Sequence, residues 1–559
     1  MWLKLTQLRT PLDFDEAGLP GLIAQTLRLP AAAVFEMRIY RKSLDARHKA
    51  ISFVYSVYFQ VDGTAYELEA ILRTTPNLVV EEPYHPEFAT WREPAPLPPE
   101  PVDPAPDASA GRGKPKPHIK RPIIVGAGPA GLFAGLRLAR AGYRPLIIER
   151  GDGLAERIGA VESFWREGKL DPESNIQYGI GGAGTFSDGK LTSRSKDPAS
   201  AEVFEILVAM GAPPEIRYWQ YPHLGTDLLR RVVEGLQRLI SDWGGEFQFR
   251  SRLSDLRLDK QRLTALTLNE RTEIGADAMV LATGNSARDV YHLLYQKGLA
   301  LEAKSFAVGL RIEHPQDLIN RAQYGRWYGH PRLGAAEYHL TYKHPETRRG
   351  IYSFCMCPGG FVVGATSESD AVVTNGMSYL ARDAAHANAA VVVTVGPADF
   401  KAKSPLGGVY FQETLEKLAF SLGGGGYRAP AQRLEDFFRK QPSTGFPALP
   451  PTYQPGVTPA NLWDLFPGEL SQTLCDGLQY FGRQLRGYDW PEAVLTGVET
   501  RTSAPLRILR GEDRQAVGVV GIYPAGEGAG YAGGIVSSAL DGWKTAGAMI
   551  EQLSVNSKP

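Results

Sequence analysis

The sequence predicts an α/β fold in which a Rossmann-like dinucleotide-binding domain carries an inserted α+β domain and follows a small ferredoxin-like α+β domain. Three observations lead to this prediction. A proline-rich segment sets off the first part of the chain, a glycine fingerprint follows it directly, and two later apolar strands end in glycines. The predicted parts are a ferredoxin-like domain over 1–91, a linker over 92–121, the first part of the dinucleotide-binding domain over 122–299, an inserted substrate or cap domain over 300–495, and the second part of the dinucleotide-binding domain over 496–559.

The composition excludes several classes of function. The 559 residues include 61 Lys and Arg against 61 Asp and Glu, so the chain has no net positive charge to collect nucleic acid or anionic lipid. No apolar run approaches the roughly 18 residues of a membrane-spanning helix. The first 16 residues hold no apolar block long enough for a signal peptide, and the three cysteines are too few for a disulfide framework. We therefore expect a cytoplasmic protein that does not bind a membrane.

The region before the linker predicts the element order β-α-β-β-α-β of a ferredoxin-like unit. Strands are expected in WLKLTQL, EMRIYRK, AISFVYSVYFQV and NLVVEEP, and helices over 16–29 and in TAYELEAILRT. The central hairpin is basic, so it is either a solvated tip or a surface for an anionic partner such as RNA. Its basic residues are Arg38, Arg41, Lys42, Arg47, His48 and Lys49.

The linker sequence, REPAPLPPEPVDPAPDASAGRGKPKPHIKRP, is rich in proline and poor in large apolar residues. Such a composition cannot bury a core and favours extended backbone. The sequence therefore predicts a solvated spacer between two folded regions.

The segment after the linker has the pattern of a dinucleotide-binding βαβ unit. A short apolar strand leads into Gly126-x-Gly128-x-x-Gly131, a helix follows to about Arg140, and a second strand ends in Glu149. The three glycines allow, in turn, a tight turn, close approach of a pyrophosphate, and close packing of helix on strand. The phosphates would lie at the helix N-terminus, and the acid would accept hydrogen bonds from the adenosine ribose. The predicted contact residues are Gly126, Gly128, Pro129, Ala130, Gly131, Glu149 and Arg150.

Two later segments narrow the choice of dinucleotide. DAMVLATG ends in Thr283 and Gly284, and GVVGIYPAGEGAG contains Gly526 and Glu527. With the fingerprint, these segments resemble the two-dinucleotide-binding flavoproteins of the glutathione-reductase class. The resemblance implies FAD, with Glu527 holding the ribityl chain and a following helix N-terminus facing the flavin pyrimidine ring. The residues implied at that helix start are Gly533, Gly534 and Ile535.

Two neighbouring patterns complete the predicted domain. FQFRSRL, RLTALTL and the approach to DAMVLATG are expected to form a small β-meander. Gly528-x-Gly530-x-x-Gly533 is a second glycine match that would suit a separate NAD(P) site. Too few residues follow it for another βαβ unit, so we interpret it as the closing element of the one dinucleotide-binding domain.

Longer segments carry a more specific resemblance. They resemble an uncharacterised bacterial family of FAD-dependent dehydrogenases, also called NAD(P)/FAD-dependent oxidoreductases. The resemblance implies non-covalent FAD and oxidation or reduction of a small organic substrate, and NADH or NADPH is a candidate electron donor. The segments are GIGGAGTFSDGKLTSR at 179–194, PHLGTD at 222–227, YSFCMCPGGFVVGATSES at 352–369, VVTNGMSYLARD at 372–383, GVETRTSAPLRI at 497–508 and YPAGEGAGYAGGI at 523–535.

The loop GGAGTFSDGK is rich in backbone N–H donors and small side chains that can approach a flat ring. In the resembled family and its wider relatives this loop lies by the flavin, which implies Gly182, Ser187, Asp188 and Lys190 as contacts, the last three as catalytic candidates. Lys190 would stabilise negative charge on the reduced flavin near N1. The alternative is that Lys190 caps a turn or forms an ion pair with Asp188.

Two further patterns leave their roles open. Cys355-x-Cys357 precedes a Pro-Gly turn, and we interpret both as small strand residues, because a disulfide across one residue is strained and zinc needs about four ligands. The segment GVETRTSAPLR places Arg501 and Arg507 ahead of the last predicted strand. An arginine there either binds a substrate carboxylate or forms structural ion pairs.

Three hypotheses of function follow. The first is a flavin-dependent dehydrogenase or reductase of a small organic molecule. The second is an RNA-associated flavoprotein that uses the basic hairpin and the basic residues of 112–121. The third is a flavin-binding protein with a structural or sensing role. The sequence does not predict the substrate, the electron donor or the oligomeric state.

Overall fold

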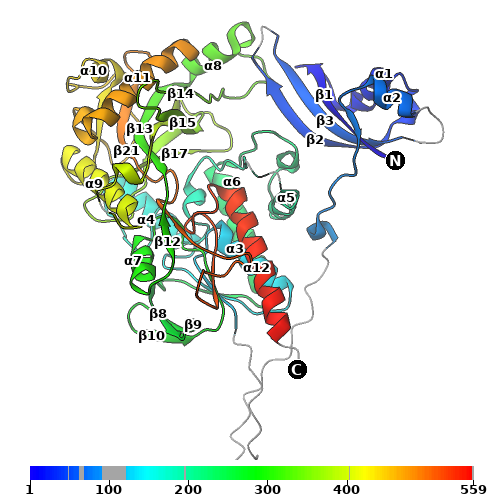
Figure 1. Ribbon diagram of the computed structural model, residues 1–559. Helices are drawn as coiled ribbons and strands as arrows, with labels where there is room; N and C mark the ends of the chain where they lie inside the picture. The colour runs from blue at the N-terminus through cyan, green and yellow to red at the C-terminus, as the bar shows by residue number, and fades with distance from the viewer. Residues whose placement is uncertain are drawn as a thin grey trace, which may run out of the picture.

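The computed structural model describes residues 1–47, 50–61, 68–90, 121–193, 195, 197–401 and 403–556. Figure 1 shows a small sheet domain beside a larger body that contains the remaining sheets. The predicted spacer over 92–121 lies outside the described residues except for Arg121, as do His48 and Lys49 of the basic hairpin.

The small domain has the predicted element order. Its four strands form one antiparallel sheet in the order β2-β3-β1-β4. Alternate residues of β3, such as Phe53, Val57 and Phe59, are buried and share a core with Ile23 and Leu27 of the first helix. The elements are β1 (Trp2–Pro11), α1 (Leu19–Leu27), β2 (Phe35–Asp45), β3 (Ser52–Gln60), α2 (Leu68–Thr74) and β4 (Leu78–Val80).

A parallel sheet of five short strands, in the order β23-β11-β5-β6-β7, forms the centre of the dinucleotide-binding part. Ile124 points into a core with the helices α3, α6, α12 and α5 (Ser200–Ala209), of which α12 runs beside α3 in Figure 1. Ile123 and Val125 point to the opposite side. The elements are β5 (Ile123–Val125), α3 (Pro129–Arg140), β6 (Leu146–Ile148), α6 (Gly225–Asp242), β7 (Glu246–Gln248), β11 (Met279–Leu281), β23 (Ile522–Pro524) and α12 (Ile535–Asn556).

The predicted β-meander differs in one strand. FQFRSRL was expected to contribute a meander strand, but its first residues belong to β7, which pairs in parallel with β6. The antiparallel three-stranded sheet consists instead of β8 (Leu253–Asp259), β9 (Arg262–Leu268) and β10 (Thr272–Gly275), and it packs on the face of the parallel sheet opposite the helices. The prediction was wrong there because a three-residue strand carries no periodicity that distinguishes a parallel from an antiparallel neighbour.

A second large sheet has seven strands in the order β14-β15-β18-β13-β21-β19-β20. All of its strands come from the chain between β11 and β23, and the predicted boundary between 495 and 496 falls inside β21. The chain enters this region through β12 (Leu301–Ala303) and leaves it through β22 (Leu506–Ile508), and these two strands pair with each other. The strands are β13 (Phe306–Pro315), β14 (Thr341–Lys343), β15 (Gly350–Cys357), β18 (His386–Val395), β19 (Ala429–Arg433), β20 (Val457–Pro459) and β21 (Val494–Glu499).

The remaining helices and the last small sheet surround these layers. Helices α9 and α11 pack on the second sheet. None of the helices in the described part of the chain is both long and apolar enough to span a membrane. These elements are α4 (Leu154–Glu167), α5 (Ser200–Ala209), α7 (Arg288–Gln296), α8 (Gln316–Tyr324), β16 (Gly360–Gly364), β17 (Thr374–Ser378), α9 (Gly407–Leu422), α10 (Leu434–Phe438) and α11 (Gly468–Gln484).

The small domain is joined to the larger body through its basic hairpin. The backbone of Lys42 exchanges hydrogen bonds with Tyr218 and Gln220, which extends the edge of β2 by one bridge. The Lys42 ammonium pairs with Glu16 and lies 4.9 Å from the ring centroid of Trp219. Lys42 therefore serves this internal contact, and it is not a free cation on a solvated surface.

Candidate functional site

A cavity of about 1460 Å³ opens where the parallel strands end. It exceeds the roughly 300–1,000 Å³ of sites for drug-sized ligands, so it is large enough for a ligand bigger than these. Open parallel sheets bind ligands at the carboxyl ends of their strands. Its lining includes every predicted contact residue except Gly131, namely Gly126, Gly128, Pro129, Ala130, Glu149, Arg150, Gly182, Ser187, Asp188, Lys190, Thr283, Gly284, Gly526, Glu527, Gly533, Gly534 and Ile535.

The three fingerprint glycines are required for different reasons. Gly126 has φ +103°, and a Cβ there would lie 2.3 Å from the Ala282 carbonyl oxygen. A Cβ on Gly131 would lie 1.8 Å from the carbonyl oxygen of Gly126, so this glycine serves helix packing and not the cavity wall. A Cβ on Gly128 would approach nothing closer than the Gly182 Cα at 3.8 Å. The protein itself would accept a methyl group at Gly128, so its own packing does not require glycine there.

Glu149 ties the turns around the cavity together. Its buried carboxylate accepts hydrogen bonds from the backbone N–H groups of Ala127 at 2.8 Å, Gly151 at 2.9 Å and Gly179 at 2.9 Å. A carboxylate has about four acceptor positions, so one is left for a ribose hydroxyl. The neighbouring Arg150 lines the cavity but is held by Glu173 and Asp289 and stacks over the ring of Tyr178.

The two later glycine segments meet at the cavity. A Cβ on Gly528 would lie 2.3 Å from the carbonyl oxygen of Gly284, so the two turns are in contact. The Glu527 carboxylate accepts a hydrogen bond from Asn285 Nδ2 at 2.8 Å, and burial raises the pKa of Glu527 to about 7. The sequence interpretation overlooked Asn285, although it directly follows Gly284.

A buried arginine shapes the loop that precedes Lys190. Arg157 of α4 is fully buried and donates to the carbonyl oxygens of Asn175, Ile176 and Gly182, among others. Ser187 serves the same loop, because its Oγ donates to the Gly184 carbonyl at 2.7 Å and accepts from the Gly189 N–H at 3.0 Å. Arg157 lies in a mixed polar and apolar stretch, so no local signal marks it as a loop organiser.

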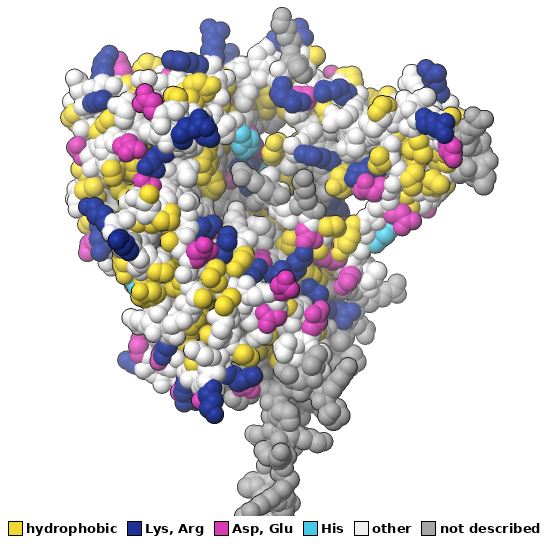
Figure 2. All heavy atoms as spheres, viewed as in Figure 1, with side chains coloured by type: hydrophobic (Ala, Val, Ile, Leu, Met, Phe, Trp, Pro, Cys, Tyr) yellow, Lys and Arg dark blue, Asp and Glu magenta, His cyan; other side chains and the backbone are white. Residues whose placement is uncertain are grey.

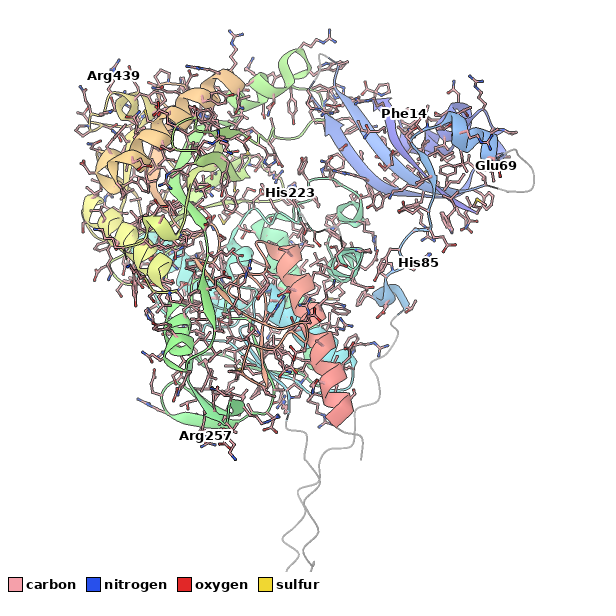
Figure 3. The ribbon with its side chains drawn as sticks, in the orientation of Figure 1. Phe14, Glu69, His85, His223, Arg257 and Arg439 are labelled. Atoms are coloured by element: carbon pink, nitrogen blue, oxygen red, sulfur yellow. The ribbon has the colours of Figure 1, made fainter. Side chains whose placement is uncertain are left out.

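Asp188 is the centre of an ion cluster. Its fully buried carboxylate accepts from Lys190 Nζ at 2.5 Å, from Arg382 Nε at 3.0 Å and from Ser378 Oγ. Burial opposes ionisation, but the charges of Lys190 and Arg382 hold the pKa of Asp188 well below its usual range. The ion pair between Lys190 and Asp188, one of the two alternatives, is therefore present, and Lys190 also lines the cavity. His223, labelled in Figure 3, forms a backbone bridge with Lys190.

The two neighbouring cysteines lie in different surroundings. Register shifts by one residue between Phe354 and Cys357, and Cys355 has φ +43°, so β15 carries a bulge at this point. Cys355 lines the cavity, whereas Cys357 is fully buried and its Sγ donates to the Cys355 carbonyl oxygen at 3.3 Å. Arg311 Nη1 donates to the same carbonyl oxygen at 3.2 Å. The interpretation of both cysteines as strand residues did not include this exposure of Cys355 to the cavity.

Arg501 of the GVETRTSAPLR segment is held by protein groups, whereas Arg507 lies 5.2 Å from the ring centroid of Tyr531. Arg501 donates to Glu416 at 2.9 Å and to Ser367 Oγ at 2.7 Å, and Arg288 binds the same glutamate at 2.6 Å. Arg501 therefore forms structural ion pairs, and it also lines the cavity. Among the described residues, no three His, Cys, Asp or Glu side chains are grouped in a way that would hold a metal ion.

FAD, which the sequence resemblance implies, fits this arrangement. The space in front of Gly128 would take the pyrophosphate at the N-terminus of α3. The remaining acceptor position of Glu149 suits a ribose hydroxyl, and the carboxylate of Glu527 lines the part of the cavity where α12 begins. These positions match the three functions that a dinucleotide cleft needs: phosphate approach, ribose recognition and a helix N-terminus.

Known families and one relative match most of this chain. The family model described as "FAD-dependent protein, C-terminal domain-like" matches residues 305–502, that for pyridine nucleotide-disulphide oxidoreductases matches 120–293, and a domain of unknown function matches 3–60. A protein of Clostridium beijerinckii, described as an uncharacterized protein, is 48% identical over 435 residues. The match covers 78% of this chain and 81% of the relative.

Solved structures give weaker likenesses. NikD, an amino acid oxidase essential for nikkomycin biosynthesis, is 13% identical with a TM-score of 0.35, over 77% of this chain and 94% of that one. The halogenase PltM is 12% identical with a TM-score of 0.35, over 78% of this chain and 70% of that one. TM-scores of this size carry no argument about activity, so the assignment of this chain to a family depends on the family models and the relative.

Proposed function

Because this chain belongs to a family of FAD-dependent oxidoreductases, we propose that it transfers hydride or electrons between non-covalently bound FAD and a small organic substrate. One observation carries the proposal. The cavity extends past the glycine segments to β14 and β15 of the second sheet, where Tyr342, Tyr352 and Phe354 line it. A site for the dinucleotide alone would not need this second wall.

The chain's own residues would bind and orient the cofactor. Bound FAD supplies a ring system that accepts and returns electrons. Gly128 and the N-terminus of α3 would hold the pyrophosphate, and Glu149 the ribose. With a pKa of about 7, Glu527 exists in both protonation states near neutral pH, so it can accept a hydrogen bond from a ribityl hydroxyl or donate one.

The second wall suits a small, partly apolar substrate. The aromatic side chains of Tyr352 and Phe354 would displace water from the space beside the cofactor. Two ammonium groups, those of Lys190 and Lys304, line the same cavity and would stabilise negative charge that develops on the substrate or on the cofactor. The protein would thus contribute position, exclusion of water and charge, which are the usual contributions in flavin catalysis.

The proposal is tested by spectroscopy on the purified protein. We expect bound FAD to give a visible flavin band, and anaerobic addition of NADH or of NADPH to bleach that band. A protein that carries no FAD and takes up none when it is added would contradict the cofactor assignment. A bound flavin that stays oxidised with both nucleotides, and that after photoreduction passes electrons to none of a panel of small organic acceptors, would contradict the proposed activity.

A further inference from the structure

Two neighbouring cations, Lys304 and Arg507, lie where the chain passes between the two large sheets. Lys304 directly follows β12 and Arg507 lies in β22, and these strands pair so that Ala303 faces Leu506. The Lys304 backbone N–H donates to the Pro505 carbonyl oxygen at 2.9 Å. Burial and the charge of Arg507 lower the pKa of Lys304, so the two charged groups are close to each other.

Neither cation is balanced by an ion pair within the part of the chain that the structure describes. The Lys304 ammonium has no described hydrogen-bond acceptor, and Arg507 Nε is buried without one. Glu302 faces Arg507 in the strand pair but forms no ion pair with it. The acid whose charge reaches Lys304 is Glu527. Because burial raises the pKa of Glu527 to about 7, this acid is only partly ionised at neutral pH and does not balance two cations.

The pair lies at the wall of the cavity that the proposed function assigns to cofactor and substrate. Lys304 is half-buried and lines this cavity, as does Tyr531. Arg507 is not part of the lining, but its guanidinium lies 5.2 Å from the centroid of the Tyr531 ring. A Cβ on Gly530 would lie 3.0 Å from the Arg507 Cα, so β22 packs directly against the turn that carries Glu527.

Other cations of the cavity are already paired with acids. These pairs are Arg150 with Glu173, Lys190 with Asp188, Arg252 with Glu270 and Arg501 with Glu416. Lys343 also lines the cavity, but it is exposed to water on β14. On the surface that Figure 2 shows, Lys and Arg are interspersed with Asp and Glu, so that face has no large basic patch that would attract anions. Lys304 is therefore a half-buried cation of the cavity with its hydrogen-bonding capacity left for an anionic ligand.

We propose that Lys304 binds a carboxylate of the substrate and that the charge of Arg507 strengthens this attraction. The substrate class is then that of small organic acids whose apolar part contacts the aromatic side chains of Tyr352 and Phe354. An ammonium group binds a carboxylate through a charge-assisted hydrogen bond, and partial burial makes the attraction stronger than at the surface. The inference rests on the proposed function, because the carboxylate belongs to the molecule that exchanges electrons with FAD.

The test measures the binding of benzoate, an aromatic carboxylate, to the FAD-bound protein by isothermal titration calorimetry. Benzyl alcohol, in which a hydroxymethyl group replaces the carboxylate, is the uncharged comparison ligand. We expect benzoate to bind more tightly than benzyl alcohol, and we expect Lys304→Met to weaken benzoate binding roughly 10-fold or more. Lys304→Gln should lose as much, and Lys304→Arg less, because it keeps the charge. Arg507→Met should weaken benzoate binding by a smaller factor than Lys304→Met.

Two controls locate the effect. Lys343→Met removes an exposed cation from the same cavity and should leave benzoate affinity unchanged. Flavin fluorescence during titration of the Lys304→Met apoprotein should give the FAD affinity of the wild type, and its melting temperature reports whether the variant is folded.

Several results would overturn the inference. They are an FAD-bound protein that does not bind benzoate, a folded Lys304→Met or Lys304→Gln variant with unchanged benzoate affinity, and an equal loss in Lys343→Met. A loss of FAD affinity as large as the loss of benzoate affinity would assign Lys304 to a phosphate of the cofactor and would also overturn it. Benzoate binding that depends on Lys304, in a protein whose bound flavin exchanges electrons with no donor or acceptor, would instead count against the proposed function alone.

Discussion

A methyl group added at Gly128 should weaken cofactor binding and leave the stability of the fold almost unchanged. In Gly128→Ala the new Cβ would have the Gly182 Cα, 3.8 Å away, as its nearest neighbour, and the backbone has φ −75° and ψ −176°, which any residue adopts. We therefore expect the free energy of unfolding without FAD to change by less than about 0.5 kcal/mol. The methyl group would occupy the space that the pyrophosphate needs, so FAD binding should weaken.

The size of the loss follows from the contact that is blocked. One hydrogen bond from a backbone N–H to a charged phosphate contributes about 1.5–3 kcal/mol. Its loss should weaken FAD binding roughly 10- to 150-fold. Flavin fluorescence during titration of the apoprotein measures the dissociation constant, and urea unfolding measures the stability.

Two other glycines provide the controls. Gly131→Ala would place Cβ 1.8 Å from the Gly126 carbonyl oxygen, so this variant should unfold more easily even without FAD, by about 1–3 kcal/mol. Gly159→Ala lies within α4 with nothing within 4 Å of the new Cβ, and it should stabilise the helix by about 1 kcal/mol and leave FAD affinity unchanged. A Gly128→Ala protein with the FAD affinity of the wild type would refute the placement of the pyrophosphate.

Three further predictions concern charged groups. Glu149→Gln should lower both FAD affinity and the stability of the apoprotein. Backbone N–H groups would lose their hydrogen-bond acceptor, at a cost of about 1–3 kcal/mol of unfolding free energy each. Equal stability of variant and wild type in urea would contradict the role described for this carboxylate. Lys190→Met should lower the flavin reduction potential by roughly 30 mV for each 1.4 kcal/mol of lost stabilisation. Lys190→Arg should lower it less, because the charge is kept. An unchanged potential in a redox titration of Lys190→Met would mean that this lysine acts only as the ion-pair partner of Asp188. Glu416→Gln should destabilise the fold by about 3–5 kcal/mol near neutral pH, because Arg288 and Arg501 lose their buried counter-charge, as urea unfolding would report. Arg288 and Arg501 lower the pKa of Glu416 to about 2 against the effect of burial. The contribution of Glu416 to the stability of the wild type is therefore complete above the ordinary glutamate pKa of about 4.3 and is lost as pH falls toward 2. The melting temperatures of wild type and variant should converge over that pH window.

Local patterns predicted the elements of the dinucleotide cleft. Short local patterns mark the fingerprint glycines, the acid after the second strand and the two later glycine turns. The structure brings all of them except Gly131 to one cavity. The role of Glu149 in joining Ala127 and Gly179 was not visible, because it depends on backbone groups that only the folded chain brings near.

The contacts that the sequence did not predict join distant residues. Arg288 and Glu416 meet across the boundary between the two large sheets, and nothing in either local sequence indicates the pair. The bulge that exposes Cys355 also depends on a partner distant in sequence, because the register of β15 is set by its pairing with β18. Hydrophobic periodicity gives information about neighbours a few residues apart and none about such partners.

The position of β23 beside β11 determines when the cofactor site can form during translation. These strands are neighbours in the parallel sheet, although one ends at Leu281 and the other begins at Ile522. The ribosome therefore synthesises the whole seven-stranded sheet before the last strand of the first sheet emerges. Such long loop closure is slow and leaves a strand edge open, which favours misassociation of nascent chains. The half of the cavity proposed to bind the phosphates, built from β5, α3 and β6, emerges early, so under this proposal FAD bound there would wait for Glu527 to complete the site.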